Sequence, residues 1–79
     1  MRLDKYLKVS RLIKRRTVAN EACDNERVTV NGKVARAPYE VKVCDVIAIR
    51  FGERTLSVEV VSVQDNAGKA DAAALYREV

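Results

Sequence analysis

The sequence predicts a single small α+β domain in which two N-terminal helices pack on a small, mostly antiparallel sheet. Apolar residues recur at helical spacing near the N-terminus, and beyond residue 25 they alternate with polar ones, as strands require. An Asn-Gly pair, the dipeptide most typical of a two-residue hairpin turn, stands between two of the alternating runs. A chain of 79 residues can bury one modest core.

Two helices are predicted before residue 25. Leu3, Tyr6 and Leu7 form one apolar stripe, which predicts a helix over residues 2–9. Thr17 is expected to be the N-cap of a second helix. The apolar members of that second helix are Val18, Ala19, Ala22 and Cys23.

Strands are predicted from residue 28 to residue 63. Residues 28–30 and 33–34 form a hairpin around Asn31-Gly32. The mostly apolar residues 46–51 read as a buried strand, and residues 55–63 as its return strand. The residues that compete for the inward face of the return strand are Leu56, Val58, Val60 and Val61.

The end of the chain is predicted to be less regular. Residues 64–68 are expected to form a loop, and the alanine-rich residues 69–76 a short C-terminal helix that is marginal or partly packed. We therefore divide the chain into a domain over residues 1–66 and a short helical extension over residues 67–79.

The composition argues against an enzyme. The chain has no histidine, which removes the commonest general base and the commonest zinc ligand. Its three glycines form no phosphate-binding loop. Cys23 and Cys44 are expected to be plain core residues. We expect no catalytic residue, no metal and no cofactor.

The sequence also argues against a membrane or secreted protein. No apolar stretch approaches the roughly 20 residues that span a bilayer. The charged N-terminus lacks the apolar region of a secretory signal. We therefore expect a cytoplasmic protein without a membrane partner.

Positive charge is concentrated at the N-terminus. Residues 1–16 hold seven bases and one acid, a local net charge of +6, whereas the other 63 residues hold 8 bases and 10 acids. Such an excess at one end of a small domain attracts phosphates by releasing their counterions. Nucleic acid is therefore the expected partner, although a basic helix face can also serve only to keep a protein soluble.

Three short segments carry a resemblance to a known family. They are Arg-Leu-Asp-Lys-Tyr-Leu at residues 2–7, the basic junction Arg-Arg-Thr at 15–17, and Arg-Val followed by Val-Asn-Gly-Lys-Val over 27–34. Their order and spacing resemble the S-four (S4) RNA-binding domain of the alpha-L type. Residues 2–17 and the tail from residue 49 onward are further similar to stand-alone ribosome quality control factors of the RqcP family.

The sequence departs from the family pattern at two turns. Glu26 stands where the family usually has glycine, and Val43-Cys44 replaces a usual Pro-Gly. A residue other than glycine at position 26 is expected to adopt a left-handed backbone conformation.

The resemblance implies a factor that binds obstructed large ribosomal subunits. The implied partners are large-subunit rRNA, P-site peptidyl-tRNA and a NEMF-type alanine-tailing factor on the same subunit. Such a protein would act as a monomeric clamp that supports alanine tailing of the stalled chain.

The candidate RNA-binding residues come from the helical pair and the adjoining hairpin. They are Arg2, Asp4, Lys5, Lys8, Arg11, Lys14, Arg15, Arg16, Arg27 and Lys33. For Asp4 we favour orienting Arg2 or Arg16 over contacting RNA itself. Tyr6 is expected in the core and Asn31 as a turn residue. Only four aromatic residues occur, which argues against base stacking of the kind that RNA-recognition-motif and OB-type domains use.

Two alternatives stay open. One is a factor like heat shock protein fifteen, which would recycle large subunits or assist rRNA maturation. The other is a protein-binding adaptor or a DNA-binding regulator that uses its first two helices as a helix-turn-helix.

Overall fold

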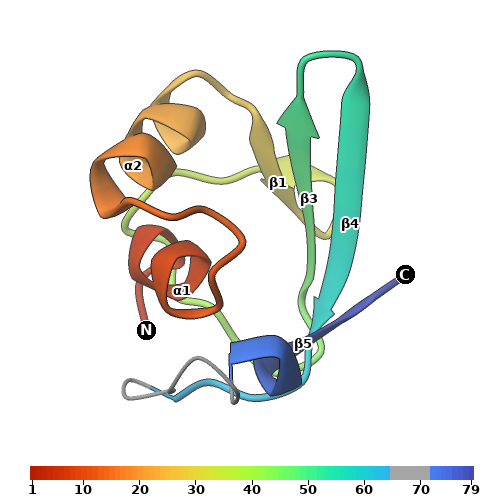
Figure 1. The fold of residues 1–79 in the computed structure, drawn as a ribbon. Coiled ribbons are helices and arrows are strands. Elements are labelled where there is room, and N and C mark those ends of the chain that lie inside the picture. The colour runs from red at the N-terminus through yellow and green to blue at the C-terminus, as the bar shows by residue number, and fades with distance from the viewer. Residues whose placement is uncertain (65–71) are drawn as a thin grey trace.

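The computed structural model describes residues 1–64 and 72–79. Both helices cover one face of a single five-stranded antiparallel sheet with strand order β2-β1-β3-β4-β5 (Figure 1). The predicted α+β class is confirmed. The elements are α1 (Leu3–Val9), α2 (Arg16–Asp24), β1 (Val28–Val30), β2 (Lys33–Val34), β3 (Val46–Phe51), β4 (Arg54–Val60), the 3-10 turn η1 (Ala73–Leu75) and β5 (Tyr76–Glu78).

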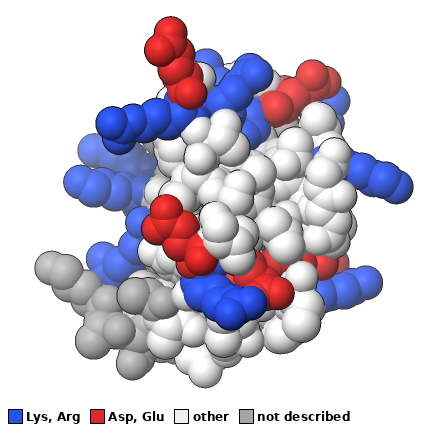
Figure 2. Space-filling view, turned by 90° about the vertical axis from the view of Figure 1, so that its right-hand side faces the viewer, with Lys and Arg blue, Asp and Glu red and all other residues white. Residues whose placement is uncertain are grey.

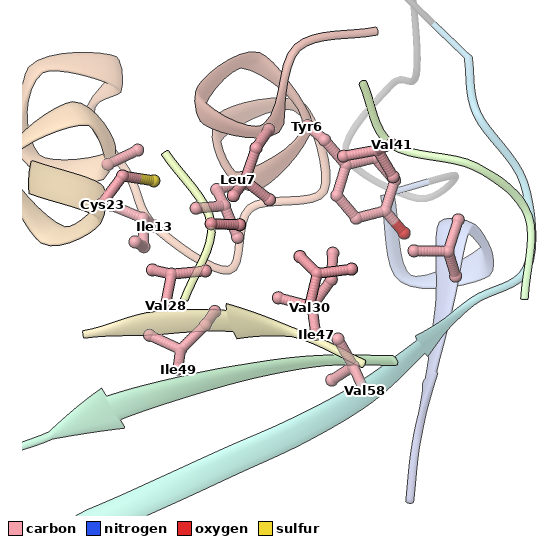
Figure 3. Packing of buried hydrophobic residues seen from close by; sticks show 14 of the residues in the cluster. Tyr6, Leu7, Ile13, Cys23, Val28, Val30, Val41, Ile47, Ile49 and Val58 are labelled. Atoms are coloured by element: carbon pink, nitrogen blue, oxygen red, sulfur yellow. The ribbon is translucent and has the colours of Figure 1, made fainter. Parts of the chain in front are cut away.

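The core lies between the two helices and the sheet (Figure 3). Tyr6 is fully buried, as predicted, and its hydroxyl donates a 2.7 Å hydrogen bond to the carbonyl of Leu75. Burial on this scale contributes roughly 1.5–3 kcal/mol per large apolar side chain. The labelled members of the cluster are Tyr6, Leu7, Ile13, Cys23, Val28, Val30, Val41, Ile47, Ile49 and Val58.

The N-terminus runs beside the connection between β2 and β3. The amide of Leu3 donates to the carbonyl of Tyr39 at 2.8 Å, and the amide of Val41 donates to the carbonyl of Met1 at 2.9 Å. An isolated antiparallel bridge pairs Arg2 with Glu40. The backbone on both sides of Arg2 is therefore fixed before α1 begins.

The second helix begins earlier than predicted. Its first residue is Arg16, and its N-cap is Arg15, which has an extended backbone and no capping hydrogen bond from its side chain. The prediction of Thr17 as N-cap was wrong, because the carbonyl of Arg15 already accepts a hydrogen bond from the amide of Ala19 at 3.0 Å. This register buries Ala19 and leaves Val18 47% exposed.

The hairpin between β1 and β2 has the predicted two-residue turn. Asn31 and Gly32 have φ angles of 53° and 84°, as a type I′ turn requires. The Asn31 side chain accepts a hydrogen bond from the amide of Val46 at 2.9 Å and donates one to the carboxylate of Asp45 at 3.1 Å. Asn31 is therefore a turn residue that also fixes the start of β3.

Two residues other than glycine adopt left-handed conformations where the family usually has glycine. Glu26 has a φ of 59°, as expected, and Cys44 has a φ of 78°. Cys44 lies in a tight turn, in which the amide of Asp45 donates to the carbonyl of Lys42 at 3.1 Å. This turn leaves Cys44 exposed, so its placement in the core was wrong, whereas Cys23 is buried.

The two C-terminal elements differ from the expected helix. Of the predicted helix at 69–76, residues 69–71 lie outside the described residues, as does the proposed domain boundary after residue 66. The described remainder forms one 3-10 turn, and β5 then pairs with β4. Of the four residues competing for the inward face of β4, Val58 and Val60 are buried, Leu56 is half-buried and Val61 is exposed.

In the part of the chain that the structure describes, no helix is long and apolar enough to cross a membrane.

Candidate nucleic-acid interface

Seven bases of the N-terminal stretch form what we name the basic surface. They lie on α1, on the connection to α2 and at the start of α2, and all are exposed except the half-buried Lys5. On α1 the bases recur every three residues, so they lie along one side of the helix while the apolar stripe faces the core. The basic surface comprises Arg2, Lys5, Lys8, Arg11, Lys14, Arg15 and Arg16.

Asp4 connects the two helices at the centre of the basic surface. Its side chain is almost fully buried, and the Arg16 Nε donates to its Oδ2 at 3.3 Å. The Arg2 Nε lies 3.3 Å from its Oδ1, and the Asn20 Nδ2 lies 3.4 Å from its Oδ2. Both arginine side chains are about half exposed, and each ion pair uses only the Nε, so Asp4 holds the guanidinium groups in place while leaving their other donors for a ligand.

The same contacts set the charge of Asp4. Burial opposes its ionisation, but hydrogen bonds from Arg16, Asn20 and the Lys5 amide outweigh burial and hold the pKa of Asp4 below its usual value. Asp4 is therefore a carboxylate at neutral pH. This geometry fits the orienting role that the sequence favoured.

The start of α2 carries charge of the unfavourable sign. Lys14, Arg15 and Arg16 stand at the positive end of the helix dipole, and the first turn contains no acidic residue. Cations at this end of a helix lower its stability. A bound phosphate would satisfy both the cations and the exposed amides of the first turn.

A tight turn shapes the connection between the helices. The amide of Arg11, which has a φ of 63°, donates to the carbonyl of Lys8 at 3.1 Å. The amide of Ile13 donates to the carbonyl of Leu7 at 3.1 Å, and the Ile13 side chain is buried. This apolar anchor leaves Arg11 and Lys14 exposed on either side of it.

The other candidates lie in two surface grooves. Lys14 and Arg27 line one groove, between α2 and the end of β3. Lys33 lines another, on the hairpin side, together with Arg36 and Tyr39. The structure thus brings Arg2, Asp4 and Arg16 into contact, but it does not join Lys33 to them.

Sequence reasoning missed two polar residues beside these sites. Asn20 contacts Asp4, and the signal was its position one helical turn after Arg16. Arg36 lines the hairpin groove with Lys33, and no periodicity marks it because it lies two residues beyond the end of β2.

The opposite side of the sheet has a different character. Figure 2 views the molecule from the side away from the helices, where the centre is uncharged and acidic side chains stand beside basic ones. The register places Thr29, Ala48 and Ser57 side by side on this face. Because charges of both signs lie close together on this face, it creates no net positive electrostatic potential that would attract phosphates.

The cysteines and acids do not form a metal centre among residues 1–64 and 72–79, in which no three ligand side chains cluster. Cys23 is buried, and burial, aided by the charges of Asp4 and Asp24, raises the pKa of its thiol to about 11. Cys23 is therefore a neutral thiol of the core.

Comparison with known proteins agrees with this geometry. The S4 domain family matches residues 1–47. Among curated proteins, the "RQC P-site tRNA stabilizing factor" of Halalkalibacterium halodurans is 54% identical over 96% of this chain and 86% of its own length. The protein of the same name from Bacillus subtilis is 49% identical over 96% of this chain and 88% of its own length.

Solved structures show the same fold. Heat shock protein 15 of Vibrio cholerae, described as trimeric, has a TM-score of 0.92 and 30% identity over all of this chain and 81% of its own. The solution structure of the hypothetical protein HP1423 has a TM-score of 0.85 and 28% identity over all of this chain and 96% of its own. By its sequence match and its fold, the chain belongs to the S4 domain family and, within it, to the family of RQC P-site tRNA stabilizing factors.

Proposed function

We propose that this protein binds RNA on obstructed large ribosomal subunits and stabilises peptidyl-tRNA in the P site. The observation that carries the proposal is the pair of arginines held by Asp4 on the basic surface. A guanidinium group fixed in this way can donate two parallel hydrogen bonds to one phosphate. The identity to proteins named for P-site tRNA stabilisation supports the same ligand.

The protein is proposed to act without catalysis, by bridging two RNA backbones. RNA helices are recognised mainly by shape and by contacts to phosphates and 2′-hydroxyls, which need no catalytic group. We propose that it works in the cytoplasm beside a NEMF-type factor that adds alanine to the stalled chain. We also propose that it does so as a monomer, which sedimentation equilibrium over a range of concentrations would test.

Co-sedimentation with large subunits that carry P-site tRNA tests the proposal. Arg16→Ala should strongly weaken binding at moderate salt, because it removes a phosphate contact and leaves Asp4 with one fewer cation. Arg77→Ala is the matched control, because it makes the same change in charge at an exposed arginine outside the basic surface. Arg77 lies on β5 and pairs with Glu59 of β4. Equal binding by both variants and the wild type would contradict the proposed site.

A second candidate function is recycling of large subunits or maturation of rRNA. The likeness to heat shock protein 15 over the whole chain favours it. The two functions differ in the particle that is bound. Sedimentation with assembly intermediates rather than with tRNA-loaded subunits would favour the second function.

A further inference from the structure

Phe51 is the exposed aromatic residue of the chain. All four aromatic residues are described, and Tyr6 is fully buried. Tyr39 and Tyr76 are half-buried and pack against the core. Phe51 is 46% exposed and is not part of that cluster. Its ring is therefore available for a contact that the fold does not use.

The strand β3 points Phe51 toward the helix side of the sheet. Side chains on a strand alternate between its faces, and Ile49 and Ile47, two and four residues before Phe51, are buried beneath the helices. Phe51 continues this row at the end of the strand, where the helices no longer cover it. It therefore extends the apolar face of the core to the surface.

A groove lies in front of this uncovered position. It has a volume of about 290 Å³ and runs between α2, the connection before α2 and the end of β3. Its apolar lining includes Leu12, Ile13, Val18, Ala22, Ile49 and Phe51. Val18 is 47% exposed, so both walls present apolar surface to solvent.

Cations surround the apolar part of the groove. Lys14 and Arg27 line it, against the single acid Glu21. Arg50 also borders the groove, but alternation along β3 points its side chain toward the outer face, where it lies beside Ala48 and Thr55. The backbone holds Arg27 against β3, because the amide of Arg50 donates to the carbonyl of Arg27 at 2.9 Å. Lys14 also belongs to the basic surface, so the groove opens directly from it.

We propose that this groove receives one unpaired nucleobase of the bound RNA, which stacks on Phe51 while Lys14 and Arg27 hold the adjoining phosphates. The inference rests on the proposed RNA binding. It adds that the bound RNA contains a bulge or a loop at this groove rather than an uninterrupted helix. An aromatic ring beside cations is the usual arrangement for a splayed base and its backbone.

Charge and size favour a nucleotide over a peptide in this groove. Two cations, Lys14 and Arg27, against one acid attract phosphates, whereas a groove for an apolar peptide needs no such excess. The volume lies at the lower end of the range for small-molecule sites, which suits one flat base.

The test compares two RNA hairpins with equal numbers of phosphates. One carries the fluorescent base 2-aminopurine as a single-nucleotide bulge, and the other carries it paired within the stem. The wild-type protein should bind the bulged hairpin about tenfold more tightly than the paired one, which is the gain in affinity that one base–aromatic stack gives. Binding should also quench the fluorescence of the bulged base. Phe51→Leu, which keeps an apolar side chain, should lose both the preference and the quenching, and Phe51→Trp should keep them.

Two control variants separate this inference from the proposed function. Val46→Ala alters an exposed apolar residue of the same strand and should leave both affinities unchanged. Arg16→Ala should weaken binding to both hairpins and leave their ratio unchanged. Melting temperatures would show that each variant is folded.

Several results would overturn the inference. Equal wild-type affinity for the two hairpins would overturn it and leave the proposed function standing, whereas binding to neither would overturn both. An equal loss on both hairpins in Phe51→Leu would also overturn it. Binding of an oligoalanine peptide that depends on Phe51, without quenching of the bulged base, would assign the groove to a peptide instead.

Discussion

Asp4 is the one acid among the first sixteen residues, and its position explains why a basic surface contains it. It is 2% exposed and accepts hydrogen bonds from the side chains of Arg16 and Asn20 on α2 and from the backbone amide of Lys5 on α1. A buried carboxylate is costly unless it is paired and hydrogen-bonded. Here that pairing fixes two arginines that could otherwise point anywhere in solvent.

Asp4→Asn should lower the free energy of unfolding by about 1–3 kcal/mol at pH 7, because hydrogen bonds to a charged group are lost. The pKa of Asp4 is lower in the folded than in the unfolded protein, so its contribution is complete above the unfolded value of about 4. This contribution is lost as the pH falls through the folded pKa. Urea denaturation between pH 7 and pH 2.5 should therefore show the difference from wild type shrinking at low pH.

The exposed Asp24 on α2 supplies the control for that experiment. Asp24→Asn should change the unfolding free energy by only a few tenths of a kcal/mol, as surface substitutions usually do. A difference between Asp4→Asn and wild type that stays constant across the pH range would contradict the charged role of Asp4.

Glu26→Gly should stabilise the protein by about 1 kcal/mol. The φ of 59° at this position is strained for a residue with a Cβ and free of strain for glycine. The matched control is Glu21→Gly within α2, which should destabilise by about 1 kcal/mol because glycine weakens a helix interior. Thermal melts measure both variants, and a loss of stability in both would show that Glu26 is not strained.

At the scale of elements, the sequence predicted what local patterns determine. The stripe of Leu3, Tyr6 and Leu7 located α1, and Asn31-Gly32 located the hairpin, because each pattern acts within a few residues. The start of α2 was missed by two residues, since the N-cap is Arg15 rather than Thr17 and makes no side-chain capping hydrogen bond of the kind that sequence rules look for.

Long-range pairing accounts for what was not predictable. The strand β5 has three residues and no clear alternation, and it is held by pairing with β4 and by the Arg77–Glu59 ion pair. The cluster of Arg2, Asp4 and Arg16 was foreseen as one of several possibilities, because both arginines lay in the family motif. The groove at Phe51 was not foreseen, because it depends on how far the helices extend along β3.

Arg15→Asn should stabilise the fold by about 1 kcal/mol and weaken RNA binding. Asparagine is a favoured N-cap, and the extended backbone of Arg15 suits that role. The substitution also removes a cation from the unfavourable end of α2 and one candidate phosphate contact. Urea denaturation and RNA titration at fixed salt measure the two effects.

Lys42→Asn is the control for that variant, because it makes the same change in net charge at an exposed residue of the β2–β3 connection. It should leave RNA affinity nearly unchanged. If it weakens binding as much as Arg15→Asn does, affinity follows net charge alone and the start of α2 has no special role.

At the scale of the whole molecule, charge is divided between the two sides. Six of the seven bases of the basic surface are exposed, whereas the outer sheet face has an uncharged centre with both signs of charge around it (Figure 2). The protein therefore has one side suited to phosphates.

RNA affinity should fall steeply with salt. If about five bases contact phosphates, the logarithm of the affinity should fall with the logarithm of salt concentration with a slope of about −3.5 to −4.5. Removal of one contact in Arg16→Ala should make the slope less negative by about 0.7–0.9. Titrations of RNA at several salt concentrations between about 50 and 300 mM measure the slope. An RNA affinity that does not change with salt would contradict this interface.

The most direct measurement is site-specific crosslinking to large ribosomal subunits that carry P-site tRNA, followed by sequencing of the attached RNA. A photoreactive side chain at Thr17, exposed beside Arg16, should yield reads concentrated on tRNA and on large-subunit rRNA beside the P site. The same group at Val46, on the outer face of β3, should yield few reads. Equal or greater crosslinking from Val46, or reads from Thr17 scattered over the rRNA without tRNA, would contradict an RNA clamp built on α1 and α2.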